Sequence, residues 1–578
     1  MIATVVLLAL PLVATYLVAT IWHRRFRQYA GIPQLKPSFL WGHLRAIHEL
    51  TTLQSRPGLH PDHVFAEMAR QLGHPPLMLL DLRPVRPPMI IVTSHEVAEQ
   101  ITRVSKLFPW STPKSPTMSS LVRLTGAESI LAKNGEDWKQ LRRRYNPGFA
   151  PQHLMSLLPC ILDKTDMFVE HLDRYAGSGE EFQLSKLAIN LTFEIIGAVT
   201  MDVDFHAQHP ESSGQGEFIK LFDQLLHMYG PVDNRFPWWM YPRREWRRWR
   251  LSEQIDRLLE DMIRHKHAEH QQQAGKAGRA RDVLSLSLQD SKELTKSLLS
   301  ETRDQLKTFL FAGHDTTGIL LSWVFYELSR TPAALKAVRD ELDDLFGPDP
   351  SPAAVRRKLL APGGEELIHR MAYTTAVIKE VLRLHPPGAT ARMSPPGTGF
   401  RVRTSDGQSF CLDGAILYNC ATIIQRDRTV FGDTANDFMP ERWLGDKVGI
   451  MSAGAGGGAD EDAGRKLPAG AWRAFERGPR NCIGQDLATI EARVIVAVVA
   501  RRFDFVKVGL GELDLDAEGR PVLDEKGQFK TKSELYSVSS VMAGSGRASI
   551  PPPPPPPSPP PLRVTAQSML TVIDRRSR

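Results

Sequence analysis

The chain has 578 residues, of which 42% are hydrophobic and 24% are charged. That length and composition allow a large buried core, as one large domain or as two, and exclude general disorder. The formal net charge of +7 is small for this length, and the 72 basic and 65 acidic residues are mixed along the chain. Nucleic-acid binding is therefore not indicated, whereas contact with an anionic membrane or an acidic protein partner is compatible with the charge.

Residues 1–22 carry no charged side chain. A helix of that length, at about 1.5 Å per residue, spans roughly 33 Å and can cross the hydrocarbon core of a bilayer. The cations Arg24, Arg25 and Arg27 follow the apolar run, which predicts a membrane anchor with the rest of the chain facing the cytosol. A cleaved signal peptide is the alternative, although the apolar run is long and no charge precedes it.

Residues 23–44 are basic and contain prolines that cannot continue a helix, which predicts a stiff extended hinge after the anchor. From about residue 60 the hydrophobic pattern is mainly helical, with a short strand at Met89–Thr93. We therefore expect a mainly α fold with small β-sheets over residues 45–578.

Three stretches have the composition of insertions. Residues 267–282 are polar, and residues 451–464 are rich in glycine, alanine and acidic residues, so both are predicted to be exposed and flexible. Residues 551–561 are proline apart from Ser558, which predicts polyproline II structure. This segment either replaces the tip of a terminal β-hairpin or belongs to a disordered tail, and the sequence leaves both open.

Cysteine spacing excludes two common uses of the thiol. The four cysteines are far apart and form no C-x-x-C pair, so neither a disulfide framework nor a zinc site is indicated and a reducing compartment fits. They are Cys160, Cys411, Cys420 and Cys482.

Cys482 stands just before Gly484 and a stretch with helical periodicity. The N-terminus of a helix carries partial positive charge and favours a thiolate. Glycine at positions 478 and 484 lets the backbone approach the sulfur closely, and backbone N–H groups tune the electron donation of a thiolate. The pattern indicates a ligand for a soft metal centre such as haem iron.

The loop around this cysteine resembles the haem-ligand loop of the cytochrome P450 family, the haem-thiolate monooxygenases. Phe475, Gly478, Arg480, Cys482 and Gly484 occupy all five fixed positions of the family pattern. The resemblance covers roughly residues 30–550. It implies haem b with Cys482 as the axial ligand of the iron, in a triangular helical haem-binding domain behind an N-terminal transmembrane helix.

A second match concerns three charged residues. Glu380 and Arg383 lie three apart and share one helix face, so they can pair. Arg442 follows about sixty residues later on a turn that Pro440 fixes. By resemblance these three residues form a buried structural network that locks the fold around the haem loop, and they are not catalysts.

The helical run from about Glu301 to Arg330 contains Gly313, Asp315 and Thr316. Glycine in a helix interior costs about 1 kcal/mol relative to alanine, so we expect a local opening of the helix beside a ligand. By resemblance Gly313 belongs to the oxygen-binding segment, Thr316 organises the hydrogen bonds that deliver protons, and Asp315 supplies protons from solvent.

Four residues are predicted to contact the haem propionates. Trp138 and Arg142 lie four apart on one helix face and resemble the family's W-x-x-x-R pair, while Arg480 and Arg392 are further candidates. The cations Lys139, Arg142, Arg143 and Arg144 either form a solvated face or, as we favour, a docking patch for an acidic electron donor.

Two regions concern the substrate and the membrane. Residues 236–241 are mostly aromatic, and the arginines that follow give the composition of an interfacial segment, with core packing of the tryptophans as the alternative. Residues 107–125 lie where the family keeps a variable substrate loop. The chain also departs from the common His-Arg-Asp-Pro pattern at 425–428, where it reads Gln-Arg-Asp-Arg, and we expect this to alter local packing only.

These features predict a membrane-anchored monooxygenase that inserts one oxygen atom from dioxygen into a small lipophilic organic substrate. The resemblance implies electrons from a separate NADPH-dependent cytochrome P450 reductase, with cytochrome b5 as a possible second donor, and a single-pass location in the endoplasmic reticulum membrane. The loop sequence is most similar to filamentous-fungal members that act on secondary metabolites of polyketide type. Fatty-acid, sterol or xenobiotic hydroxylation, a haem-thiolate isomerase or dehydratase, and a non-catalytic haem protein are the alternatives.

Overall fold

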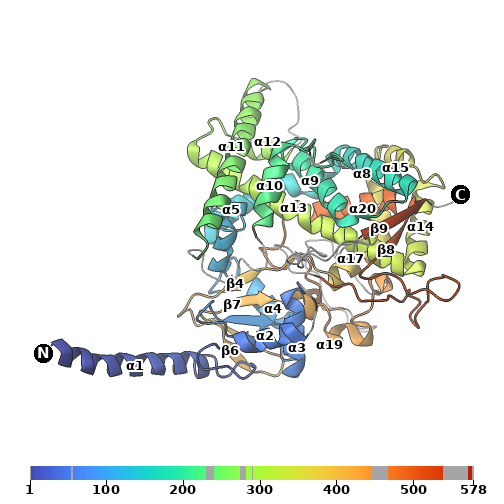
Figure 1. Cartoon of the computed structure of the whole chain (residues 1–578). Coiled ribbons are helices and arrows are strands. Elements are labelled where there is room, and N and C mark those ends of the chain that lie inside the picture. The colour runs from blue at the N-terminus through green and yellow to red at the C-terminus, as the bar shows by residue number, and fades with distance from the viewer. Residues whose placement is uncertain are drawn as a thin grey trace, which may run out of the picture.

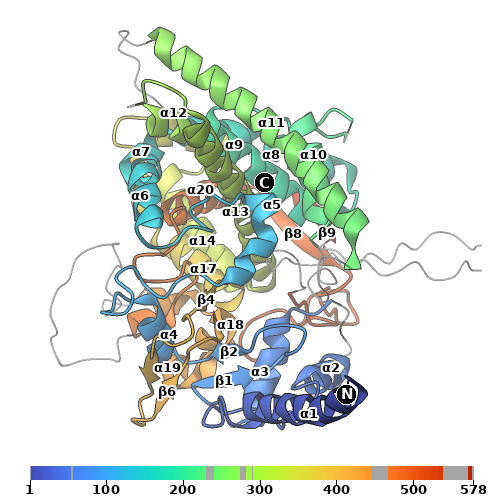
Figure 2. The same ribbon diagram turned by 90° about the vertical axis from the view of Figure 1, so that its left-hand side faces the viewer.

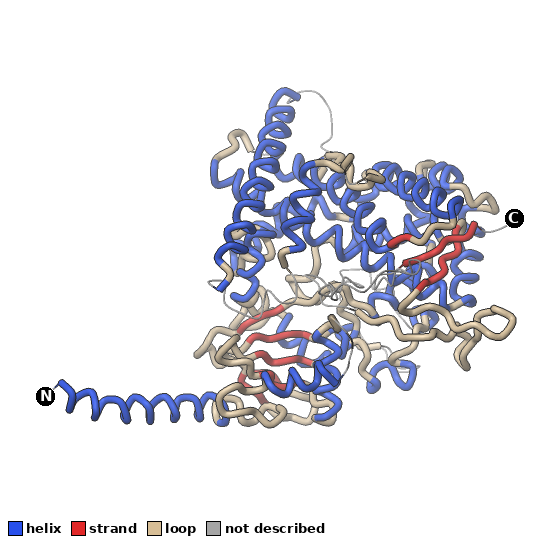
Figure 3. Tube along the Cα trace, viewed as in Figure 1, coloured by secondary structure: helices blue, strands red, loops and turns tan. Residues whose placement is uncertain are grey.

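The computed structural model describes residues 2–575 except 54, 55, 57, 212, 230–239, 274–281, 290, 445–466 and 538–569. Helices dominate the chain, and the strands gather in small sheets (Figures 1 and 3). The mainly α fold with small β-sheets is therefore confirmed. The first half contains α1 (Ile2–Phe26), α2 (Leu44–Leu53), α3 (Pro61–Gln71), α4 (His95–Thr102), α5 (Val122–Thr125), α6 (Gly135–Tyr145), α7 (Pro151–Ser156), α8 (Leu158–Ser178), α9 (Leu184–Met201), α10 (Glu217–His227), α11 (Pro242–Gln273) and α12 (Val283–Leu288).

The second half supplies the helices that surround the predicted site. The 35-residue α13 begins after Thr295, whose hydroxyl caps it by accepting a hydrogen bond from the Leu298 N–H. In chain order these helices are α13 (Lys296–Arg330), α14 (Pro332–Phe346), α15 (Pro352–Leu359), α16 (Glu365–Arg370), α17 (Ala372–Leu384), α18 (Ala421–Ile424), α19 (Arg428–Phe431) and α20 (Gln485–Val499).

Three small sheets complete the fold. The four-stranded sheet has the order β1-β2-β7-β4, with β2 and β7 parallel and the other pairs antiparallel. It lies beside α2, α3 and α4 (Figure 1). A three-stranded sheet has the order β3-β9-β8, and β5 pairs with β6. The strands are β1 (Leu77–Leu80), β2 (Met89–Val92), β3 (Phe182–Gln183), β4 (Ala391–Met393), β5 (Arg401–Arg403), β6 (Ser409–Cys411), β7 (Ile416–Asn419), β8 (Phe503–Val508) and β9 (Leu570–Arg575).

The core centres on the contact between α13 and α9, since most residues of both helices are buried. Figure 2 shows α13 inside the helical part of the molecule. Among the described residues, α9 is the helix long and apolar enough to qualify as a membrane span, but 72% of it is buried inside the protein. Its hydrophobicity is explained by core packing.

The N-terminal structure corrects the predicted hinge. α1 runs through the predicted anchor and continues to Phe26, so the helix includes the first residues of the hinge. Arg25 is not a solvated flanking charge: its side chain is 4% exposed and pairs with Asp81 at 2.6 Å. The chain becomes extended only after the turn that ends near Ile32.

The structure describes part of one of the three predicted insertions. Residues 267–273 are not a loop but the last two turns of α11, which continues to Gln273. The remainder of that stretch up to 281, together with 451–464 and 551–561, lies outside the described residues. β9, which follows the proline segment, pairs antiparallel with β8.

Candidate functional site

Cys482 lies in a loop held by backbone contacts. Its N–H donates to the carbonyl oxygen of Phe475 at 2.9 Å, and Gly484 forms the N-cap of α20. Gly478 has a φ of 77°, and a β-carbon there would collide with the backbone oxygen of Thr102 on α4. Glycine is therefore required at 478 on two grounds, whereas at Gly484 a β-carbon would meet only Sγ of Cys482, at 3.9 Å.

The thiol of Cys482 is accessible. The residue is exposed, yet desolvation by the surrounding protein raises the pKa of its thiol, opposed by the Gly484 N–H and the charge of Arg142. Because its side chain is exposed, the sulfur is accessible to a ligand.

α13 has an accessible face in the middle of a buried helix. Ala312 is exposed and Thr316 is half-buried, while the apolar residues on either side of the segment are buried. The Thr316 hydroxyl donates to the carbonyl oxygen of Ala312, in its own helix, at 2.7 Å. Asp315 lies between these accessible positions and buried His314, and is itself half-buried.

The expected helix opening at Gly313 is not observed. Residues 312–317 are continuously helical, and a β-carbon at Gly313 would approach Cγ1 of Ile196 to 2.7 Å. Glycine at this position therefore permits close packing of α13 against α9. The structure places the Gly313 α-carbon against α9, so its contribution to a ligand site is the position of the helix.

Three cations converge without acidic partners. Arg392 on β4 is fully buried, Arg480 is 7% exposed, and Lys114 lies opposite Arg392 in an isolated β-bridge. Burial lowers the pKa of Arg392 to about 10 and that of Arg480 to about 9. It also lowers the Lys114 pKa well below its ordinary value, and the charges of the two arginines lower it further. None of the three forms an ion pair with a carboxylate in the described chain.

The hydrogen bonds of this cluster leave donors unused. Arg392 donates to Ser111 Oγ at 3.0 Å, but its Nε and second terminal nitrogen are buried with no partner among the described residues. Nε of Arg480 is also buried with no partner among the described residues, although the terminal nitrogens of Arg480 donate to Asn134 and to backbone carbonyls. Asn134 Oδ1 also accepts from the Lys114 N–H at 2.9 Å and so joins the two segments. The cluster is built to receive an anionic group.

Arg142 and Trp138 have other partners. Arg142 donates to the carbonyl and side-chain oxygens of Asn481, at 2.7 and 3.0 Å, and so ties α6 to the loop of Cys482. Trp138 is buried with the guanidinium of Arg480 over its ring, at 4.9 Å from the centroid. Trp138 therefore packs against one member of the cation cluster, and Arg142 positions the Cys482 loop.

The pairing of Glu380, Arg383 and Arg442 is as predicted. Glu380 accepts two hydrogen bonds from Arg383, at 2.8 Å each, and one from Arg442 at 2.9 Å. The Trp443 indole and the Met439 N–H also donate to this carboxylate. Arg383 uses its remaining donors on backbone carbonyls of 425, 435 and 437. All three charged side chains are thereby satisfied inside the protein.

Gln425 has a structural role. This buried side chain donates to the carbonyls of Leu382 and Arg383 at 3.0 Å each and accepts from the Arg473 N–H at 2.8 Å. It therefore links the end of α17 to the start of the Cys482 loop. The residues that it contacts are structural, so the expectation that the departure at 425–428 alters packing and touches no proposed chemistry is not contradicted.

The proposed docking patch is partly occupied by internal pairs. Arg144 pairs with Glu301 at 2.6 Å, and Lys139 lies over the Trp110 ring at 4.2 Å from its centroid. Of the four cations of the predicted patch, Lys139 and Arg143 are exposed, whereas Arg142 and Arg144 are half-buried. Residues 236–239 lie outside the described residues, but Trp246 and Trp249 on α11 are exposed, as an interfacial segment requires.

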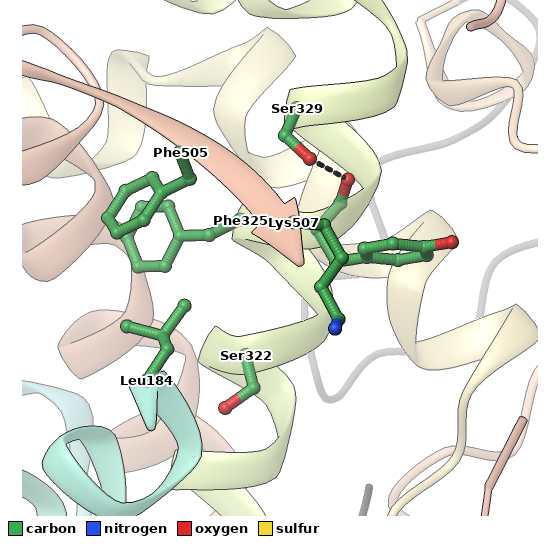
Figure 4. A pocket seen from close by; sticks show the side chains of 7 residues that line it. Leu184, Ser322, Phe325, Ser329, Phe505 and Lys507 are labelled. Carbon is green, nitrogen blue, oxygen red and sulfur yellow. Dashed lines mark hydrogen bonds between the residues drawn. The ribbon is translucent and has the colours of Figure 1, made fainter. Parts of the chain in front are cut away.

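One hollow lies away from the predicted site residues. It is lined by residues of α9, α13 and β8, among them Leu184, Ser322 and Lys507 (Figure 4). Burial lowers the pKa of Lys507 to about 8. None of the predicted site residues lines this hollow, so it is not the site of Cys482.

Comparison with known proteins decides the family. Residues 50–525 match the family model described as Cytochrome P450. This chain belongs to the cytochrome P450 family. Cytochrome P450 monooxygenase acrF of Aspergillus aculeatus is 31% identical over 77% of this chain and 88% of its own length. Cytochrome P450 monooxygenase polC of Polytolypa hystricis is 28% identical over 86% of this chain and 87% of its own.

A third relative bears on the electron supply of this cytochrome P450. A bifunctional cytochrome P450/NADPH–P450 reductase of Alternaria alternata is 25% identical over 72% of this chain, which covers 34% of that longer protein. The P450 family binds haem and receives electrons from NADPH through a reductase, so this chain is a haem-thiolate monooxygenase.

The described residues fit a haem. A haem carries two carboxylates on one edge, and the P450 has three desolvated cations close to the Cys482 loop, of which Arg392 and Arg480 keep buried donors without a partner among the described residues. Sequence reasoning found Arg480 and Arg392 but missed Lys114, because Lys114 belongs to no motif. Its only signal is a basic residue inside the expected substrate loop 107–125.

Proposed function

We propose that this P450 is a membrane-anchored monooxygenase that oxidises a small lipophilic substrate, of polyketide type, in fungal secondary metabolism. Its two similar fungal relatives are themselves named cytochrome P450 monooxygenases, which supports the reaction class. The observation that carries the proposal is the accessible but desolvated thiol of Cys482, beside a cluster of three cations that form no ion pair with a carboxylate of the described chain.

Each site residue has a role in this proposal. When bound, haem supplies the iron centre at which dioxygen is activated. Cys482 would ligate the iron as a thiolate, and Phe475, Gly478 and Gly484 hold the loop that presents it. Arg392, Arg480 and Lys114 would pair with the haem carboxylates, while Trp138 and Arg142 position Arg480 and the loop. The Thr316 hydroxyl would order the proton donors beside the accessible face of α13, and Asp315 would connect them to solvent.

The cellular setting follows from α1. This helix projects from the body of the molecule (Figure 1), and its last turn is basic. We place it across the endoplasmic reticulum membrane as a single span, with the catalytic domain in the cytosol. Exposed Trp246 and Trp249 lie on α11, and both views put the start of α11 on the side from which α1 projects (Figures 1 and 2). A separate reductase, and cytochrome b5, would approach the cytosolic face.

Turnover experiments separate this function from its alternatives. Membranes that contain the chain and a cytochrome P450 reductase should consume NADPH and insert one ¹⁸O atom from ¹⁸O₂ into a lipophilic polyketide. An isomerase or dehydratase would form product without dioxygen, and fatty acids or sterols in place of the polyketide would reveal a different substrate class. Product formation that does not depend on NADPH and dioxygen would contradict the proposal.

Lys114→Met should lower haem affinity while making the haem-free protein more stable. The substitution removes a desolvated cation that has no acidic partner, and it also removes one charged contact to a haem carboxylate, worth about 1.5–3 kcal/mol. Haem transfer to apomyoglobin and thermal unfolding of the haem-free chain measure the two effects. Lys532→Met, at an exposed residue paired with Glu512, is the matched control. A lower unfolding temperature of the haem-free variant would assign Lys114 to folding instead.

A further inference from the structure

The loop that follows α1 presents an apolar tip. Ser38 and Gly42 form an isolated antiparallel bridge, with mutual N–H to carbonyl bonds of 2.8 and 3.0 Å. The three residues between them are exposed: Phe39 by 36%, and Leu40 and Trp41 by 56% each. Consecutive apolar residues at the tip of a tight turn are costly in water, so a covering surface is expected.

The tip is locked to the end of α1. Arg25 of α1 donates to the carbonyl oxygens of Phe39 at 3.2 Å and Leu40 at 2.7 Å. The same guanidinium pairs with buried Asp81, which also pairs with Arg83 at 2.8 Å. Because the backbone carbonyls of the tip are turned toward Arg25, the loop has a fixed position relative to the helix.

Gly42 makes this lock possible. It adopts a φ of 54°, and a β-carbon there would approach the Arg25 guanidinium to 2.5 Å. Glycine is therefore required where the turn closes over Arg25. The tip is held by a buried ion pair and a close backbone approach, so its position relative to α1 is fixed.

The charges around the tip favour an anionic surface. Arg24, Arg27 and Lys36 are exposed, and the chain contains no acidic residue before Glu49. The guanidinium of Arg27 lies over the ring of exposed Trp22, at 5.1 Å from the centroid, and Phe26 stacks on Phe39 at 6.5 Å between centroids. Aromatic residues mixed with cations beside an apolar helix are the composition of a membrane interface.

We propose that Phe39, Leu40 and Trp41 form a wedge that inserts into the interfacial layer of the membrane at the base of α1. The Arg25–Asp81 pair transmits this second point of attachment to the domain, so the wedge and α1 together fix the orientation of the P450 on the membrane. This inference rests on the proposed membrane anchoring by α1, and its test distinguishes the two.

The test uses the full chain in nanodiscs of anionic lipid that carries bromine at defined acyl depths. The chain contains 11 tryptophans, so the Trp41 signal is the fluorescence difference between the wild type and Trp41→Phe. We expect bromines near the headgroups to quench this difference several-fold more than bromines near the bilayer centre. Trp323→Phe, at a fully buried position, is the control and should give a difference that bromine does not quench.

Flotation of the same chain with vesicles reports α1 separately. If the chain floats but bromine leaves the Trp41 signal unchanged, the wedge is overturned while the anchor stands. If the chain does not float, the anchor and the wedge fail together. Arg25→Lys provides a second variant: it should retain flotation but spread Trp41 quenching over a wider range of depths, since lysine cannot bridge both carbonyls and Asp81.

Discussion

Replacing Glu380 with glutamine should give a chain that unfolds early and retains little haem. The substitution leaves the buried guanidinium of Arg383 and the nearly buried one of Arg442 without their shared counter-charge. Breaking a buried ion pair by removing one partner costs about 3–5 kcal/mol, a large share of the stability of a domain. The haem-to-protein ratio and the urea midpoint measure the loss.

A matched control separates burial from charge in this experiment. Glu49→Gln makes the same chemical change in an exposed glutamate–arginine pair, with Arg45, where the expected cost is about 0–1 kcal/mol. Arg383→Lys should resemble Glu380→Gln, because a lysine cannot reproduce the paired bonds and the three carbonyl contacts of Arg383. Wild-type haem content and midpoint in Glu380→Gln would refute a structural role for the network.

Replacing Thr316 with alanine should uncouple the enzyme without removing haem. The variant loses the hydroxyl on the accessible face of α13, together with its bond to the Ala312 carbonyl, but no core contact. A positioned proton-transfer group contributes typically 10²–10⁴-fold, so product formed per NADPH should fall by about 10²-fold while peroxide rises. Simultaneous measurement of NADPH, product and peroxide shows the change.

Two variants give this prediction its controls. Thr316→Ser keeps the hydroxyl and should restore most of the coupling. Thr317→Ala changes the neighbouring threonine, which is buried at 3% exposure, and should leave coupling nearly unchanged. Wild-type coupling in Thr316→Ala would mean that the proton relay is assigned to the wrong residue.

Sequence could predict those parts of the site that depend on local spacing. The three-residue separation of Glu380 and Arg383 puts them on one helix face, and the structure confirms their pair. The family pattern marks Gly478, but the predicted reason, close approach of its backbone to the sulfur, differs from the one in the structure, which is its φ of 77° and the nearby Thr102 carbonyl. Long helical periodicity placed α13 correctly, although its first residue is Lys296.

Contacts between distant segments could not be predicted in this way. Lys114 joins Arg392 through a bridge across 278 positions of the chain, and nothing in either segment marks the other. Gln425 connects α17 to the Cys482 loop only because both segments meet at its side chain. Likewise, Gly313 predicts a helix opening from sequence, whereas the structure shows that glycine is needed there because Ile196 of α9 packs against the helix. These three contacts depend on how distant segments pack together, and a single sequence without an alignment does not show which segments meet.

The most direct test of the account is the carbon monoxide difference spectrum of dithionite-reduced membranes that contain this chain, measured beside Cys482→Ser. Cys411→Ser, at another exposed cysteine, is the control. We predict a strongly red-shifted Soret band in the wild type and in Cys411→Ser, and its loss in Cys482→Ser. A red-shifted band that survives in Cys482→Ser, or no haem band in the wild type, would contradict the assignment of Cys482 as the thiolate ligand.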